Sequence, residues 1–133
     1  MLVDNESMIM RYVKDVPAIA WDLMELSDKP LTLIYEQPMG LAENVIAEDG
    51  SIGIRVTKDE FSQKLIYRLR KPIVSTSANI SGEPTPQCFR EINPEILNTV
   101  DHVVNLRQNE MIKEKPSSII KINTTGEIKI IRK

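Results

Sequence analysis

The hydrophobic positions of this chain follow two repeats, one typical of strands and one typical of helices. Short apolar or alternating runs predict strands at residues 2–3, 31–35, 51–56, 73–76, 101–106, 118–122 and 127–131. Apolar residues at helical spacing predict helices that begin near Asn5, Pro17 and Thr57, and shorter ones after Pro86 and Asn93. The last two strands are separated by Asn-Thr-Thr-Gly and read as a hairpin. This order predicts an α/β fold with a mixed, twisted sheet and flanking helices.

The strand at residues 51–56 has two chemically different faces. Ile52, Ile54 and Val56 alternate with Ser51, Gly53 and Arg55, so one face is apolar and the other polar. A glycine in a strand often marks the close approach of another group. The polar face is a plausible anion-binding strip, and the alternative is an exposed sheet face on which Arg55 is only solvated.

The helix after this strand carries a start signal and a basic end. Thr57 and Glu60 have the spacing of a capping box, and the helix is expected to run to about Leu69. We expect its core-facing side to be formed by Phe61, Leu65, Ile66 and Leu69. Arg68, Arg70 and Lys71 crowd its end, where the helix dipole favours cations. These three residues could touch RNA, although a solvated helix end is the ordinary meaning of such a cluster.

The stretch from Lys71 to Pro86 begins as an apolar strand and ends as a stiff turn. Ser75, Ser77 and Asn79 fall at a spacing of two, so they point the same way while the backbone stays extended. Gly82 permits a turn that a side chain would block. Two hydroxyls and an amide held in this way suit a polar ligand; the alternative is a Ser/Asn-rich turn that leads into the next helix.

Length, charge and cysteine content narrow the classes of function. A chain of 133 residues is one domain's worth, so we expect a single domain over residues 1–133. The formal net charge of −2 gives no global electrostatic case for nucleic-acid binding. The single cysteine, Cys88, excludes an internal disulfide framework. No signal peptide or membrane span is expected, and the predicted location is cytoplasmic. The polar residues from Arg107 to Pro116 predict a loop.

Residues 75–86, Ser-Thr-Ser-Ala-Asn-Ile-Ser-Gly-Glu-Pro-Thr-Pro, strongly resemble the signature of the YrdC-like family, the threonylcarbamoyl-AMP synthases. The resemblance continues in Ser-Ile-Gly-Ile-Arg-Val at residues 51–56, in Lys-Pro-Ser-Ser-Ile-Ile at residues 115–120, and in Arg132. It covers nearly the whole chain. It implies an open, twisted α/β sheet with the substrate cleft on one side.

The resemblance also implies a reaction. Members of this family condense L-threonine, bicarbonate and ATP into threonylcarbamoyl-adenylate, release pyrophosphate, and so supply an intermediate for threonylcarbamoyladenosine in tRNA. ATP is a substrate that brings Mg²⁺ with it, and no protein-bound metal is expected. Implied partners are other tRNA-modification proteins and, for a direct contact, tRNA or double-stranded RNA. Such chemistry needs substrate positioning and cations more than an acid–base residue, so no catalytic acid or base is assigned.

Matched residue by residue, the family's motifs assign two groups of contacts in this chain. The expected threonine-binding residues are Arg55, Ser77 and Ser117. The expected ATP-binding residues are Ser51, Asn79, Gln87 and Arg132.

One departure from the family pattern changes the expectation for this chain. The family's Pro-Thr-Asp/Glu-Thr strand and its later Lys-x-Arg have no match in the sequence. We therefore expect the C-terminal portion of the family's domain, incomplete at the N-terminus, inactive alone and prone to self-association. Two other functions stay open, namely a non-catalytic module that binds double-stranded RNA or tRNA, and a carbamoyl-adenylate domain of the hydrogenase-maturation type.

Overall fold

The computed structural model describes residues 1–111 and 116–133. Contacts between residues divide the chain into two compact units, residues 1–75 with 116–133, and residues 76–115. The sheet belongs to the first unit, and each unit is described by itself. The single domain expected over residues 1–133 stays a prediction.

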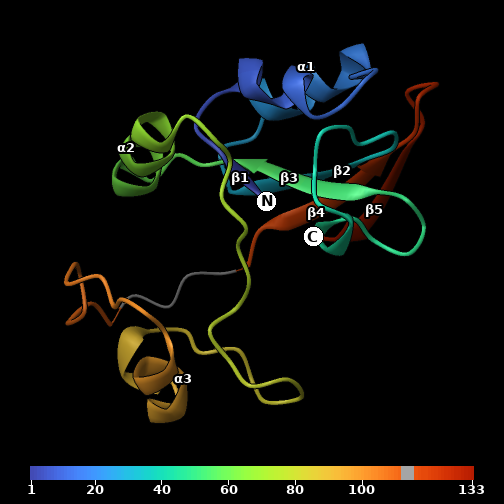
Figure 1. Ribbon diagram of the computed structural model, residues 1–133. Coiled ribbons are helices and arrows are strands. Elements are labelled where there is room, and N and C mark those ends of the chain that lie inside the picture. Colours follow the sequence, from blue (N-terminus) through green and yellow to red (C-terminus); the bar gives the residue numbers. More distant parts are fainter. Residues whose placement is uncertain (112–115) are drawn as a thin grey trace. The chain divides into compact units, whose positions relative to one another are not determined.

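The described part of the first unit is built on a mixed, open sheet (Figure 1). Its strands are β1 (Leu2–Val3), β2 (Leu31–Tyr35), β3 (Ile52–Val56), β4 (Ser118–Ile122) and β5 (Ile128–Arg132), in the order β1-β3-β2-β4-β5. The pairs β1–β3 and β2–β4 are parallel, whereas β2–β3 and β4–β5 are antiparallel. The predicted fold class and the closing hairpin are thus confirmed.

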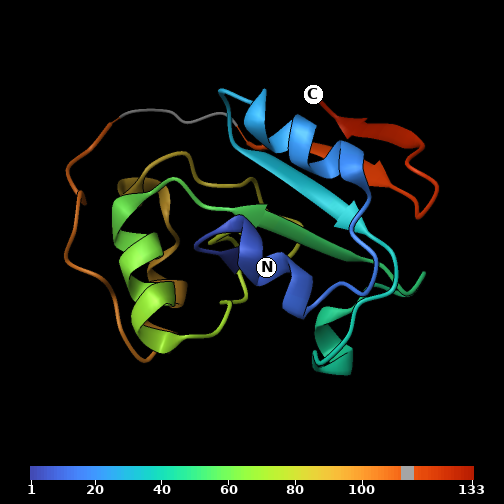
Figure 2. The same ribbon diagram turned by 90° about the horizontal axis from the view of Figure 1, so that it is seen from above.

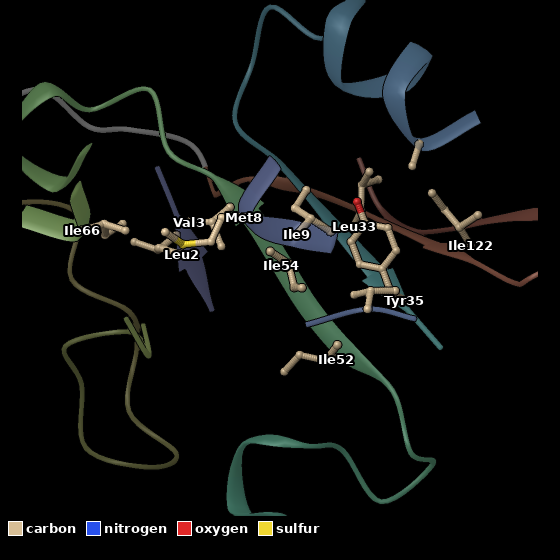
Figure 3. Close-up of a cluster of buried hydrophobic side chains, with 12 residues drawn as sticks. Leu2, Val3, Met8, Ile9, Leu33, Tyr35, Ile52, Ile54, Ile66 and Ile122 are labelled. Carbon is tan, nitrogen blue, oxygen red and sulfur yellow. The ribbon is translucent and has the colours of Figure 1, made fainter. Parts of the chain in front are cut away.

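One face of the sheet carries the hydrophobic core. Leu33 and Tyr35 of β2 lie beside Ile54 and Ile52 of β3, and all four are buried (Figure 3). The short helix η1 (Glu6–Arg11) and helix α1 (Ala18–Glu25) lie over this face in the view from above (Figure 2). They begin where the sequence predicts, because Asn5 caps η1 and Pro17 precedes α1. A further short helix, η2 (Glu43–Val45), precedes β3.

Helix α2 (Glu60–Leu69) ends at the predicted residue but begins differently. The side chain of Asp59, not Thr57, accepts the hydrogen bond from the Ser62 N–H, at 2.9 Å. The predicted capping box is therefore wrong. Thr57 is buried, and its hydroxyl accepts from the Asp59 N–H instead. A carboxylate directly before the first turn caps the helix and complements its dipole, so the helix starts two residues later than expected.

The apolar side of α2 is only partly in the core. Ile66 is fully buried, as predicted, but Phe61, Leu65 and Leu69 are between 39% and 51% exposed. Their spacing is helical, and nothing in the described residues covers them completely. Periodicity finds the apolar stripe of a helix, yet it does not say how much of that stripe another element will cover.

The prediction of a strand at residues 73–76 is wrong. Only Ile73 pairs, through a single bridge to Leu2 in which both main-chain hydrogen bonds form. Val74 is 70% exposed. Pro72 has no N–H to donate, and β1 is only two residues long, so the ladder cannot extend. The alignment of Ser75, Ser77 and Asn79 on one strand face is lost with it.

The second unit contains short helices and turns in its described part. They are η3 (Phe89–Glu91) and α3 (Pro94–Thr99), and Asn93 caps α3 as predicted. The strand predicted at residues 101–106 is wrong, because this segment is mostly exposed and pairs with no strand among the described residues. Two valines favour a strand only where a neighbour offers a ladder. Of the loop predicted from Arg107 to Pro116, residues 112–115 lie outside the described residues. Within the described ranges, no helix is long and apolar enough to cross a bilayer.

Candidate functional site

The second face of the sheet is lined by polar and positively charged groups. Gly53 pairs with Ile34, Ile34 with Lys121, and Lys121 with Lys129, so these residues share one face across four strands. A Cβ on Gly53 would lie 3.5 Å from Thr32 Cγ2, in ordinary contact, which places Thr32 on this face too. We call this surface the polar face; its members are Ser51, Gly53, Arg55, Thr32, Ile34, Ser117, Ile119, Lys121, Lys129 and Arg132.

Three strands meet at Ser117. Its Oγ lies 3.0 Å from Thr32 Oγ1, which joins the start of β4 to β2. Its carbonyl oxygen accepts from Nε and Nη2 of Arg132 on β5, at 3.0 and 2.7 Å. Two donors of one guanidinium fix the arginine more firmly than a single bond would. Thr32 therefore holds the Ser117 hydroxyl, and Arg132 holds the main-chain carbonyl of the same residue.

Arg55 projects from the same face of β3. Its main chain is anchored, because its N–H donates to the Met1 carbonyl and it pairs with Leu2 of β1. Its side chain is half-buried, and among residues 1–111 and 116–133 no hydrogen bond or ion pair engages the guanidinium. A planar cation with unused donors suits a carboxylate or phosphate. Arg55 is thus a candidate anion ligand of the polar face.

Ser51 lies at the other end of the β3 strip and is only 4% exposed. Both its N–H and its hydroxyl donate to Asp49 Oδ1, and Lys121 Nζ lies 2.6 Å from Asp49 Oδ2. These hydrogen bonds, first of all the one from Lys121, hold the pKa of the Asp49 carboxyl well below its ordinary value. Ser51 and Lys121 are therefore joined through one carboxylate.

The polar face can bind anions and position polar groups. It offers hydroxyls from Thr32 and Ser117, and positive charge from Arg55, Arg132 and the lysines of β4 and β5. Such groups bind carboxylates and phosphates and offset charge that develops on them. The structure thus brings four of the predicted site residues onto one face: Ser51, Arg55, Ser117 and Arg132.

The other predicted site residues belong to the second unit. Ser77 and Gln87 are exposed, and the Gln87 N–H donates to the Glu91 carboxylate at 2.8 Å. The amide of Asn79 donates to the carbonyl oxygens of Ile80 and Glu83, at 3.0 and 3.1 Å. Convergence of these residues with the polar face stays a prediction, as do the roles of all seven predicted residues.

Asn79 has an unused acceptor. The two hydrogen bonds of its amide group fasten the turn at residues 80–83, where Gly82 has a φ of +87°, the geometry that the sequence predicted to need glycine. Its Oδ1 atom is buried and has no partner in the described structure. Because a buried acceptor without a partner is costly, this oxygen is available for a ligand's hydroxyl or amino group.

Sequence reasoning missed Thr32, Lys121 and Lys129 of the polar face, and also Asp49, which is hydrogen-bonded to Ser51 and Lys121. Alternation along residues 31–35 could have shown that Thr32 faces away from Leu33. The same alternation from Ser117 leads to Lys121. The link from Lys121 to Asp49 spans 72 positions of sequence and has no local signal.

Comparisons with a family model and with related proteins agree on one family. The Sua5/YciO/YrdC family model, described as telomere recombination, matches residues 1–133. A Methanocaldococcus jannaschii protein named as a candidate threonylcarbamoyl-AMP synthase is 37% identical over 101 residues, which are 76% of this chain and 45% of the relative. The threonylcarbamoyl-AMP synthase of Idiomarina loihiensis is 28% identical over 109 residues, 79% of this chain and 58% of the relative. The chain thus spans about half the length of these relatives.

Solved structures support the fold. E. coli YciO superposes with a TM-score of 0.79 at 22% identity, over 99% of this chain and 63% of YciO.

Proposed function

Because this chain belongs to the Sua5/YciO/YrdC family, we propose that it forms the threonine- and ATP-binding part of an L-threonylcarbamoyladenylate synthase. In this reaction the amine of L-threonine takes up bicarbonate and loses water, giving a carbamate. The carbamate oxygen then attacks the α-phosphate of ATP, and pyrophosphate leaves. The product serves the modification of tRNA, with other modification proteins as partners, in the cytoplasm.

The observation that carries the proposal is the gathering of Thr32, Arg55, Ser117 and Arg132 on the polar face. Arg55 supplies two aligned donors for the threonine carboxylate. The Ser117 hydroxyl, held by Thr32, lies on the same face for the polar groups of threonine. Threonine and bicarbonate are both small and polar. Holding them in the right orientation therefore accounts for much of the rate gain that such a site can provide.

The nucleotide is assigned to Ser51, Asn79, Gln87 and Arg132. Asn79 offers the unpartnered Oδ1 atom, and Arg132 offers positive charge near Ser117. Mg²⁺ enters with ATP as part of the substrate. Ser77 completes the set as a hydroxyl toward threonine or its carbamate.

Two measurements test the function. Calorimetric titration of the 133-residue chain should show binding of ATP with Mg²⁺ and of L-threonine, with L-valine as a control that lacks the hydroxyl. Pyrophosphate release that needs threonine and bicarbonate should be absent from this chain alone, which spans about half of its relatives. If the chain binds neither ATP nor L-threonine, the assignment of the site is refuted. If the chain releases pyrophosphate rapidly, the expectation that it is inactive alone is refuted.

A second candidate function rests on the exposed cations Arg68, Arg70 and Lys71 at the end of α2. They could contact the phosphates of tRNA or double-stranded RNA. Because the chain as a whole carries a net charge of −2, we expect such binding to be weak and strongly salt-dependent. Fluorescence anisotropy with an RNA duplex at several salt concentrations tests this, and tight, salt-insensitive binding would favour the binding-module function.

A further inference from the structure

Lys121 and Lys129 form a like-charge pair on the polar face. They are direct partners across the antiparallel pair β4–β5, so their Cα atoms are neighbours and both side chains leave the same side. Like charges directly opposite each other destabilise a sheet. Arg132 lies on the same face of β5 and adds a third positive charge. An anion shared by these groups would remove the repulsion.

The acidic group that meets this cluster is Asp49. Lys121 Nζ lies 2.6 Å from its Oδ2, while its Oδ1 accepts from the Ser51 N–H and hydroxyl. Glu36 and Glu127 stand toward the hairpin turn, where they accept from the Thr124 N–H and the Asn123 amide. One carboxylate therefore holds the donors that an external anion would need: a buried hydroxyl, a main-chain N–H and an ammonium group.

The carboxylate is also reachable. The side chains of Lys121 and Asp49 are 30% and 54% exposed, so the pair borders solvent. Exposed ion pairs are worth little, because water and salt compete for both partners. A polyphosphate carries more charge and more oxygens than one carboxylate, so it can accept from both Lys121 and Lys129, which are direct partners across β4–β5. It should therefore compete with Asp49 for Lys121.

We propose that Lys121 is an exchangeable cation of a polyphosphate subsite on the polar face, held by Asp49 until a ligand's phosphates displace that carboxylate. Lys129 is the second cation of the subsite. The ligand class is a di- or triphosphate, either the phosphate chain of ATP or free pyrophosphate. The ATP source rests on the proposed function, whereas pyrophosphate binding does not.

The test is calorimetric titration of the full chain with ATP, AMP, pyrophosphate and L-threonine. Lys121→Met and Lys129→Met keep the aliphatic stem and remove the charge; Lys64→Met, from the exposed Glu60–Lys64 pair of α2, is the matched control. We expect each subsite variant to weaken pyrophosphate and ATP binding about three- to ten-fold. Binding of AMP and threonine, and every affinity of the Lys64→Met control, should stay within about two-fold of wild type.

The Asp49→Asn variant distinguishes two roles of Asp49: a carboxylate that a ligand's phosphates displace from Lys121, and a residue that only supports its loop. Asparagine keeps an acceptor for Ser51 but loses the charge that holds Lys121, so pyrophosphate should bind about three- to ten-fold more tightly. That gain should vanish when Lys121→Met is also present. If Asp49 only supported the loop, the variant would bind more weakly, and the proposal would be overturned.

The outcomes also separate this inference from the function. Unchanged pyrophosphate and ATP affinities in the Lys121→Met/Lys129→Met double variant would overturn the subsite while leaving threonine and ATP binding intact. Lysine-dependent pyrophosphate binding by a chain that ignores ATP and threonine would uphold the subsite and refute the proposed synthase site. Absence of any phosphate binding by the wild type would overturn the subsite outright.

Discussion

The hydroxyls of Thr32 and Ser117 meet across two parallel strands, 3.0 Å apart, although 85 positions separate them in the sequence. Thr32→Val should remove this hydrogen bond with little change of shape. We expect a loss of about 0.5–1.5 kcal/mol in the free energy of unfolding and weaker binding of threonine, because Ser117 loses its orienting partner. Urea denaturation and threonine titration measure both. Thr32→Ser keeps the hydroxyl and serves as the control; equal threonine affinities in the two variants would exclude a role for this bond in binding.

Arg55→Ala should weaken threonine more than ATP. Loss of charge-assisted hydrogen bonds to a carboxylate, at roughly 1.5–3 kcal/mol per bond, corresponds to a ten- to hundred-fold loss of affinity or more. Titration of the variant with each ligand measures the difference. Arg68→Ala, at the exposed end of α2, removes an arginine outside the polar face and should bind threonine as the wild type does. Unchanged threonine affinity in Arg55→Ala would remove Arg55 from the site.

The Asp49 carboxylate should make the free energy of unfolding depend on pH in the acidic range. Its pKa in the folded protein is lowered from the ordinary 3.8 by hydrogen bonds from Lys121 and Ser51, so the charged form favours the folded state. That contribution is present above the ordinary pKa and is lost as pH falls through it toward the lower folded-state value. Melting curves of wild type and Asp49→Asn should therefore differ at neutral pH and converge in strong acid.

The control for this comparison is Asp101→Asn, which alters an exposed carboxyl group of the second unit. At neutral pH, loss of this exposed carboxyl group should change the melting temperature much less than Asp49→Asn does. A gap between wild type and Asp49→Asn that persists unchanged into strong acid would show that the carboxylate's charge is not its cause.

Tyr35 should tolerate loss of its hydroxyl. The ring is buried in the core, and its hydroxyl has no hydrogen-bond partner in the described structure (Figure 3). A buried polar group without a partner costs about 1–3 kcal/mol, so Tyr35→Phe should leave stability unchanged or raise it by up to that amount. Chemical denaturation measures the effect; Tyr67→Phe, at an exposed tyrosine, is the matched control. A clear loss of stability would show that the hydroxyl has a partner in solution.

The same residue predicts alkaline behaviour. Burial, with the nearby Glu6 charge, raises the pKa of Tyr35 above its ordinary value of 10.0. Above that value the unfolded chain loses the proton while the folded protein keeps it, so stability should fall as pH rises past 10.0. This fall should be smaller in Tyr35→Phe than in the wild type.

Local pattern was enough for the strands that carry the polar face, and for the closing hairpin. Ile52 and Ile54 alternate with Ser51, Gly53 and Arg55, as expected for a strand with one apolar and one polar face, and the structure follows that alternation. Pattern failed at Ile73–Thr76 and Asp101–Leu106, because β-branched residues form a strand only when a neighbouring strand supplies its ladder. The Asp49–Lys121 pair was beyond reach for a different reason: it depends on register across three strands.

The parallel pairing of β2 with β4 also determines when the sheet can form. Leu31 pairs with Ser118, so this contact closes a very long loop, whereas β4 and β5 close a short hairpin. Pairings between distant segments form late, because the chain loses conformational entropy on closing the loop before the new contacts can stabilise it. Until β4 arrives, one edge of β2 has no neighbour and can pair with another chain. The newly made or refolding protein should therefore be most prone to aggregate in this interval, and dilution during refolding should raise the yield of folded protein.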